Sequence, residues 1–373
     1  MKPGWEIKTI GEVCEIRSGR NQKEVENPSG KYPIYGSGGI MGYADDYLCE
    51  AGATIIGRKG SINNPIFVET KFWNVDTAFG FSPKETILPK FLFYFCKGFN
   101  FQAMNKGTTI PSLVKTDLLQ IRIPVPSIQE QQRIVVILDQ EFAKIDALKA
   151  NAEKSLQAAK DLFQATLKKE LEPKDGWKVS SMGEVSSIAR GGSPRPIKAF
   201  ITEDADGINW IKIGDTEVGG KYISSTKEKI RKEGMRSSRF VEAGDFLLSN
   251  SMSFGRPYIL KTNGCIHDGW LVIKKYEDTF TQDFLYYLLL SPSVVKQFEE
   301  GARGSTVRNL NTDIVSAVRV SYPSTLQEQE EIVARVEEQN YKCKALQDNY
   351  QKTLSLCDDL KQALLRKAFN GEI

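Results

Sequence analysis

His267 and Asp268 are adjacent residues that could form an acid–base pair, and His267 is the single histidine of the 373-residue chain. We expect a turn that leads into the apolar run 270–273 instead, because the sequence holds no H-E-x-x-H, P-loop or G-x-S-x-G motif. One histidine also cannot build a multi-histidine metal site. The sequence therefore disfavours a standalone enzyme, and we expect neither catalytic nor metal-ligating residues in this chain.

Two further motifs suggest nucleotide chemistry but fail on spacing. The glycines of segment 36–42 miss G-x-G-x-x-G by one residue, so a glycine-rich hairpin is the better interpretation. Residues 64–67, Asn-Pro-Ile-Phe, only faintly match the Asn-Pro-Pro-aromatic motif of adenine methyltransferases, and no glycine-rich cofactor loop accompanies them. We therefore predict that this chain does not transfer methyl groups.

Basic and polar side chains in glycine-rich or hydroxyl-rich loops are the remaining candidates. Such loops can approach a phosphate backbone, and Arg or Asn within them can read base edges. The net charge of +3 is too small to establish this, and each side chain could equally be solvated surface. The candidates in the first half are Arg17, Arg20, Ser37, Arg58, Lys59, Ser61, Asn63, Thr108 and Thr109. Those in the second half are Arg190, Arg195, Lys212, Asn250, Ser251, Ser253, Arg256, Arg303, Ser305, Thr306 and Arg308.

An internal repeat determines the architecture that must position these loops. Gly4-Trp5-Glu6-Ile7 returns 172 residues later as Gly176-Trp177-Lys178-Val179, and Ala51-Gly52 returns 192 residues later as Ala243-Gly244. About twenty residues are therefore inserted early in the second copy. Aligned loops carry different polar residues, which favours two related domains with different specificities.

Each copy ends in a long apolar-periodic segment without internal glycine or proline. Apolar residues recur every three or four positions over 128–171 and 326–369, which predicts two helices of about 65 Å that pair as an antiparallel coiled coil. The predicted seam on the first helix is Val135, Leu138, Phe142, Ile145, Leu148, Ala152, Leu156, Ala159 and Phe163. That on the second is Ile332, Val336, Cys343, Leu346, Tyr350, Leu354, Cys357, Leu360 and Leu364.

The regions before the helices consist of short β-prone runs between Gly, Pro, Asn and Asp turns. One helix-like apolar segment interrupts each region, at 91–95 and 284–289. We predict an α+β protein: two β-rich globular domains separated by two long antiparallel helices, with a pseudo-twofold repeat. The predicted ranges are 1–126 and 173–323 for the domains and 127–172 and 324–373 for the helices.

The six cysteines lie far apart without a C-x-x-C pair, which predicts buried free thiols. No apolar run is long enough to span a bilayer, and the first five residues hold no apolar export segment. We expect a cytoplasmic protein that does not associate with membranes.

The doubled order of these motifs resembles the specificity subunit of type I restriction-modification systems. The order is Trp-x-Ile/Val-x-x-x-Gly-Glu-Val, a variable β-rich block, Gly-Thr/Ser-Thr-Ile/Val, then Pro-Ser and a helix that begins with Gln-Glu-Gln. The segment Tyr32 to Tyr43 also resembles one common in the target-recognition domains of that family. The resemblance covers nearly the whole chain.

The resemblance implies that each target-recognition domain reads one half of a split, asymmetric double-stranded DNA sequence. It further implies two modification subunits that carry S-adenosylmethionine, and restriction subunits that carry the nuclease and a motor dependent on ATP and Mg²⁺. This chain itself would bind no cofactor. The alternative is a structural protein whose paired helices hold partner subunits together without reading DNA.

Overall fold

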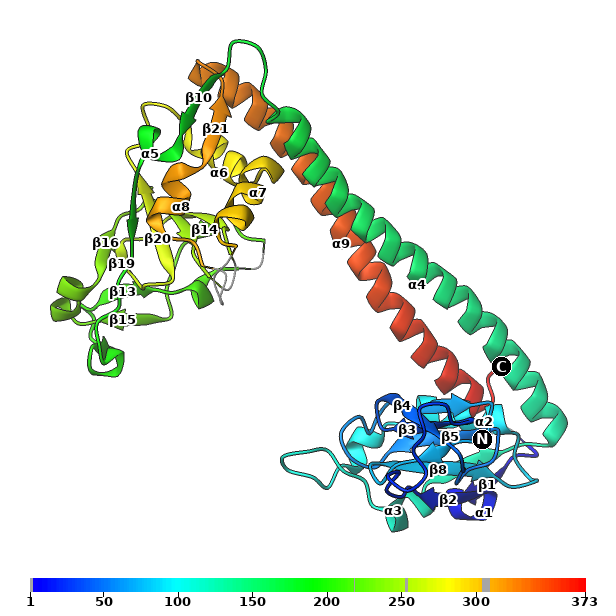
Figure 1. The fold of residues 1–373 in the computed structure, drawn as a ribbon. Helices are drawn as coiled ribbons and strands as arrows, with labels where there is room; N and C mark the ends of the chain where they lie inside the picture. Colours follow the sequence, from blue (N-terminus) through cyan, green and yellow to red (C-terminus); the bar gives the residue numbers. More distant parts are fainter. Residues whose placement is uncertain (1–2, 218, 252–253, 304–308) are drawn as a thin grey trace. The chain divides into compact units, whose positions relative to one another are not determined.

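The computed structural model describes residues 3–217, 219–251, 254–303 and 309–373 (Figure 1). The chain forms two compact units, one of Met1–Lys154 with Tyr350–Ile373 and one of Ser155–Asn349. The predicted range 1–126 falls within the first unit, and 173–323 within the second. Each unit therefore combines one globular region with parts of both long helices.

The first globular region is mainly β. Its core sheet has the order β2-β8-β5-β6, a smaller sheet has the order β4-β3-β7, and β1 pairs with β9. The strands are β1 (Glu6–Thr9), β2 (Cys14–Ser18), β3 (Tyr32–Gly36), β4 (Gly39–Ala44), β5 (Ala53–Gly57), β6 (Ile66–Val68), β7 (Trp73–Asn74), β8 (Ala78–Pro83) and β9 (Arg122–Val125). The helices are α1 (Ile10–Val13), α2 (Pro89–Gly98), the 3-10 helix η1 (Phe101–Met104) and α3 (Lys115–Leu119).

The second globular region repeats this plan with larger sheets. Its core sheet has the order β11-β20-β17-β18-β14, the counterpart of the smaller sheet has the order β12-β15-β13-β19-β16, and β10 pairs with β21. The strands are β10 (Lys178–Ser181), β11 (Ser187–Arg190), β12 (Ile201–Thr202), β13 (Ile208–Ile211), β14 (Tyr222–Ile223), β15 (Glu228–Ile230), β16 (Arg239–Val241), β17 (Phe246–Ser249), β18 (Pro257–Leu260), β19 (Gly264–Ile266), β20 (Trp270–Lys274) and β21 (Arg319–Tyr322). The helices are α5 (Met182–Val185), η2 (Ile197–Ala199), η3 (Ile213–Asp215), η4 (Lys232–Ser237), α6 (Gln282–Leu290), α7 (Pro292–Gly301) and α8 (Thr312–Ala317).

Matching sequence produces matching local structure in the two regions. Thr9 and Glu12 form a capping box at α1, and Ser181 and Glu184 form the same box at α5. The central strands β5 and β17 are buried along their whole length, in keeping with their continuous apolar sequence. The predicted apolar helical segments are α2 and α6, so the expected α+β repeat is confirmed.

The two predicted long helices are α4 (Ile128–Glu170) and α9 (Leu326–Asn370), and Figure 1 shows them paired. In the first unit, Lys149 Nζ lies 2.7 Å from Asp358 Oδ1, and Lys361 pairs with Asp146, so the helices run antiparallel there. The seam prediction is confirmed at Leu138, Ile145, Ala152, Ala159, Ile332, Val336, Cys343 and Cys357, which are all buried. It is wrong at Leu148, Leu346 and Leu360, which are 50%, 40% and 48% exposed. Each of these leucines lies one residue before a position of the seven-residue repeat that the buried seam residues follow, at 149, 347 and 361, so its side chain turns outward.

A buried glutamine at the start of each long helix fastens it to its globular region. Gln131 Oε1 accepts the Leu88 N–H at 2.8 Å, and Gln329 Oε1 accepts the Thr281 N–H at 2.9 Å. The amide of Gln131 also donates to Pro126 O at 2.9 Å, so both ends of the side chain are paired. The six cysteines are free and buried, as predicted.

Candidate nucleic-acid interface

In the first unit, four strand ends meet at one edge of the core sheet. Neighbouring strands are antiparallel, so β2 and β5 end where β8 and β6 begin. The Gly19 N–H donates to Ala78 O at 3.1 Å, and the Arg58 N–H donates to Thr77 O at 2.8 Å. We call this region the first strand-end edge; it comprises residues 17–20, 58–64 and 75–77.

The loop that carries Thr108 and Thr109 packs against this edge. The Gly60 N–H donates to Pro111 O at 2.9 Å, and the Leu113 N–H donates to Arg58 O at 2.9 Å. The loop keeps its shape because Asn105 Oδ1 accepts the N–H groups of Gly107 and Ser112, each at 2.8 Å. The structure therefore brings two exposed threonines beside the predicted basic loop.

The other candidates of the first unit differ in their exposure and in whether their side chains are already hydrogen-bonded. Arg20, Lys59 and Ser61 are exposed, and Ser37 faces the basic loop, since a Cβ placed on Gly60 would lie 3.5 Å from its hydroxyl oxygen. The guanidinium of Arg17 donates to Leu48 O at 2.6 Å and to Glu15 at 3.1 Å. Asn63 has a structural role, because its Oδ1 accepts the Phe101 N–H at 2.8 Å.

The second unit repeats the same backbone contacts at its own strand-end edge. The Gly191 N–H donates to Trp270 O at 2.9 Å, and the Asn250 N–H donates to Gly269 O at 3.0 Å. The Leu310 N–H donates to Asn250 O at 2.8 Å, as Leu113 does to Arg58 in the first copy. The second strand-end edge comprises residues 189–192, 249–251 and 267–269. One backbone framework thus presents different side chains in the two copies.

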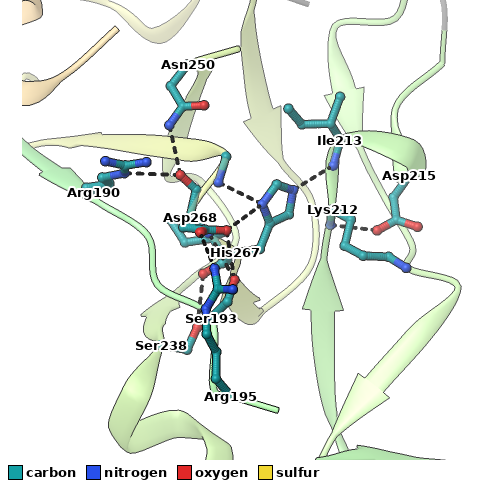
Figure 2. Close-up of polar contacts among 12 residues, drawn as sticks. Arg190, Ser193, Arg195, Lys212, Ile213, Asp215, Ser238, Asn250, His267 and Asp268 are labelled. Atoms are coloured by element: carbon teal, nitrogen blue, oxygen red, sulfur yellow. Dashed lines mark hydrogen bonds and ion pairs between the residues drawn. The ribbon is translucent and has the colours of Figure 1, made fainter. Parts of the chain in front are cut away.

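Asp268 is the centre of a hydrogen-bond cluster at the second edge (Figure 2). Its carboxylate accepts from the Ser193 hydroxyl at 2.9 Å and from Arg195 Nη2 at 3.2 Å, while its backbone oxygen accepts from Arg190 Nε at 3.1 Å. Partial burial raises the pKa of Asp268, but the Ser193 hydrogen bond and nearby positive charge outweigh burial and hold that pKa below its usual value. Asp268 is therefore ionised at neutral pH.

His267 packs inward instead of forming a catalytic pair with Asp268. The Gly269 N–H lies 2.7 Å from Nδ1, and the Ile213 N–H lies 3.1 Å from Nε2. Burial lowers the pKa of His267, and Asp268 only partly offsets this effect. A neutral imidazole has one acceptor nitrogen, so it accepts from one of these two amides, and that hydrogen bond orders the turn predicted before the apolar run 270–273.

A cavity of about 1090 Å³ opens beside this cluster. Arg195, Lys212, Glu228, Trp210 and His267 contribute to its lining. Lys212 Nζ is 2.5 Å from Glu228, and Arg195 is paired with Asp268, so both cations at the cavity have a carboxylate partner. The side chain of Arg195 is nevertheless 79% exposed at the cavity.

Asn250, predicted as a DNA contact, is only 1% exposed, and its Nδ2 donates to Asp268 O at 2.8 Å. This placement argues against a base contact by Asn250. Arg256 is partly exposed, and its guanidinium carbon lies 5.8 Å from the centre of the Tyr258 ring. Ser251 is half-buried, and Arg303, which follows α7, is exposed. The predicted residues Ser253, Ser305, Thr306 and Arg308 lie outside the described residues.

Exposed leucines occur at equivalent positions of the long helices. Leu148 on α4 and Leu346 on α9 are 198 residues apart, as are Leu162 and Leu360, and the exposed fractions lie between 40% and 50%. The first unit holds Leu148 with Leu360, and the second holds Leu162 with Leu346. Each unit therefore carries one outward leucine pair.

Neither a metal centre nor a membrane span is found in the described part of the chain. Groups of three or more His, Cys, Asp or Glu side chains able to hold a metal ion do not occur among those residues. Their helices also lack an apolar stretch long enough to cross a bilayer.

The family model for the type I restriction modification DNA specificity domain matches residues 2–158 and again residues 174–352. The chain belongs to this family. The two matches correspond to the two repeats, each with its strand-end edge, so the specificity domain occurs twice in the chain.

Relatives of this specificity family extend over nearly the whole chain. The specificity subunit of the type I restriction enzyme EcoDI of Escherichia coli is 22% identical over 404 aligned positions, which cover 99% of this chain and 88% of the relative. A chain from a structural study of complex assembly and conformational transition of the type I R-M system has a TM-score of 0.79 at 20% identity and is covered to 99%. The HsdS subunit from Thermoanaerobacter tengcongensis has a TM-score of 0.54 at 20% identity and is covered to 98%. These solved structures support the fold.

Sequence reasoning missed several residues that shape the two edges. Asn105 and Ser193 carry no motif, and their roles depend on contacts with other loops. Asp268 aligns with Asp76, 192 residues earlier in the internal repeat. That alignment was the signal available for a shared structural role.

Proposed function

We propose that this chain selects the DNA target of a type I restriction-modification complex, with each globular region reading one half of a bipartite, asymmetric sequence. The observation that carries the proposal is the shared backbone framework of the two strand-end edges, which carries Arg58 beside Lys59 in one copy and Arg190 with Arg195 in the other. Related scaffolds with different side chains fit two different half-sites.

The side chains at the first edge suit two kinds of DNA contact. Arg58 combines a fixed backbone with a long guanidinium side chain, which suits bidentate contact with a base edge. Lys59, Thr108 and Thr109 are exposed beside it and suit phosphate contacts that position the domain.

We further propose that the chain is the non-catalytic subunit of its complex. Modification subunits would hold S-adenosylmethionine, and restriction subunits would use ATP and Mg²⁺. The two outward leucine pairs support two equivalent docking surfaces for modification subunits. A Leu side chain that is half exposed can contribute about 1 kcal/mol when a partner covers it.

The test is to co-express the chain with its modification subunit in a host without adenine methylation and to map methylated adenines. We expect a bipartite motif that depends on this chain. A partner complex that assembles without any sequence-restricted methylation would instead favour the scaffold alternative.

A further inference from the structure

The second region has a different means of presenting a cation, although its framework matches the first. In the first region, Arg58 stands directly after β5 and donates to Asp76 O at 3.3 Å. In the second, the equivalent Asn250 is buried, and its amide is bonded to the equivalent carbonyl of Asp268. The short Asn side chain cannot extend beyond the edge as Arg58 does.

The loop between β11 and β13 supplies what that position lacks. Residues 193–198 and Ile201 of this loop and the start of β12 line the cavity of about 1090 Å³ together with His267 and Asp268 of the strand-end edge. Arg195 is the strongly exposed cation of this segment that is paired with Asp268. The loop after β11 therefore places a guanidinium at the edge that carries Arg58 in the first copy.

Asp268 is built to orient that guanidinium. Its Oδ1 is fixed by Ser193 at 2.9 Å, and its backbone oxygen is fixed by Arg190 and Asn250, so the carboxylate has little freedom to turn. Its Oδ2 then holds one terminal nitrogen of Arg195 (Figure 2). A guanidinium restrained on one side keeps a planar donor pair, which matches the O6 and N7 acceptors of guanine in the major groove.

We propose that Arg195 reads a guanine of the second half-site and that Asp268 is its positioning residue. This inference rests on the proposed function and adds the base and the two residues to it. In the second region the reading side chain thus comes from the loop after β11, beside the strand-end position, instead of from that position itself.

The experiment measures the initial methylation rate of the complex with its modification subunits, using duplexes of the mapped target. Each defined base pair of the second half-site is replaced in turn. For the native complex, the rate ratio between the native and replaced pair gives the preference at each position. Arg195→Ala should lower the preference at one G·C pair by roughly 5- to 150-fold and leave the first half-site unchanged.

Asp268→Asn keeps the backbone contacts and the size of the side chain, so it should reduce the preference at the same G·C pair with little change in melting temperature. In the Arg195→Ala background it should cause no further loss, because the two residues act through one contact. Lys198→Ala, at the rim of the same cavity, is the matched control and should leave the preference intact.

The inference is overturned if Arg195→Ala preserves the preference at every second-half position, or if Asp268→Asn acts at a different base pair. Arg58→Ala separates this failure from that of the proposed function. If Arg58→Ala still alters the first half-site, the inference about Arg195 fails alone. If neither arginine variant alters any preference, the proposed reading by these domains fails as well.

Discussion

Arg58 and Asn250 occupy equivalent positions and donate to equivalent carbonyls, Arg58 to Asp76 O at 3.3 Å and Asn250 to Asp268 O at 2.8 Å. Their backbone contacts also match, with Leu113 and Leu310 as donors. The two side chains nevertheless differ in exposure, since Arg58 is partly exposed and Asn250 is buried. One framework therefore leaves this position accessible for the proposed DNA reading in one copy and uses it for structure in the other.

Substitution at these two positions should have opposite kinds of effect. Arg58→Ala should weaken recognition of the first half-site alone, by about 1 to 3 kcal/mol, with complex assembly intact. Asn250→Ala should remove one of the two donors to Asp268 O, while Arg190 remains, and lower the free energy of unfolding by about 1 kcal/mol. Methylation mapping and urea denaturation of both variants measure the two effects. An unchanged motif with Arg58→Ala would contradict the assignment.

Arg256 provides a separate test of the second half-site. It lies directly before β18, next to the second strand-end edge, and its guanidinium carbon is 5.8 Å from the Tyr258 ring centre. Arg256→Ala should affect the second half-site and leave the first unchanged, because the two edges belong to separate compact units. The motif obtained from genome-wide methylation mapping decides this, and a change in the first half-site would refute it.

The glutamines at the helix starts should be stability determinants. Gln131→Leu removes the acceptor of the Leu88 N–H and the donor to Pro126 O, and should cost about 1 to 3 kcal/mol for each buried group left unpaired. Gln132→Leu changes the exposed neighbour and serves as the control. The midpoint of urea denaturation should fall for Gln131→Leu only; equal midpoints for both variants would mean that the Gln131 bonds contribute nothing.

How far the sequence predicts this molecule depends on the range of the interactions involved. The repeats, the apolar strands and the limits of the long helices follow from local patterns, and Ile128 and Leu326 begin helices as expected. The outward positions of Leu148 and Leu360 were missed, because the predicted seam includes them although each lies one residue before a position of the seven-residue repeat that the buried residues follow.

The candidate site was predictable in outline only. The sequence indicated which loops carry polar residues, and the sheet order brings those loops together at strand ends. Whether a side chain is already engaged in a structural hydrogen bond depends on contacts distant in sequence, such as Asn63 with Phe101 and Asn250 with Asp268. Local sequence patterns therefore do not predict those contacts.

The single histidine permits a direct measurement of its pKa. Burial lowers the pKa of His267 below its usual 6.5, so the unfolded chain binds a proton more readily than the folded one. The contribution of His267 to stability is therefore complete above pH 6.5 and decreases as the pH falls from there toward its folded pKa. NMR titration of the His267 imidazole ring in the untagged chain should give a midpoint below pH 6.5. A midpoint at or above 6.5 would rule out the buried, neutral ring.

The leucine pairs predict the stoichiometry of the complex. Replacing Leu148 and Leu360 together by Glu should remove one docking surface and convert a complex with two modification subunits into one with a single subunit. The equivalent pair, Leu162 and Leu346, should give the same result. Native mass measurement distinguishes these states, with Gln140→Glu, an exposed position on α4, as the control. A native complex with one modification subunit would contradict the two-surface account.

The most direct test of target selection is to map methylated adenines in a host that lacks adenine methylation and carries the modification subunit with or without this chain. The account predicts a bipartite, asymmetric motif when the chain is present, and no sequence-restricted methylation when it is absent. A continuous motif, or the same motif without the chain, would contradict the claim that its two globular regions each read half of the target.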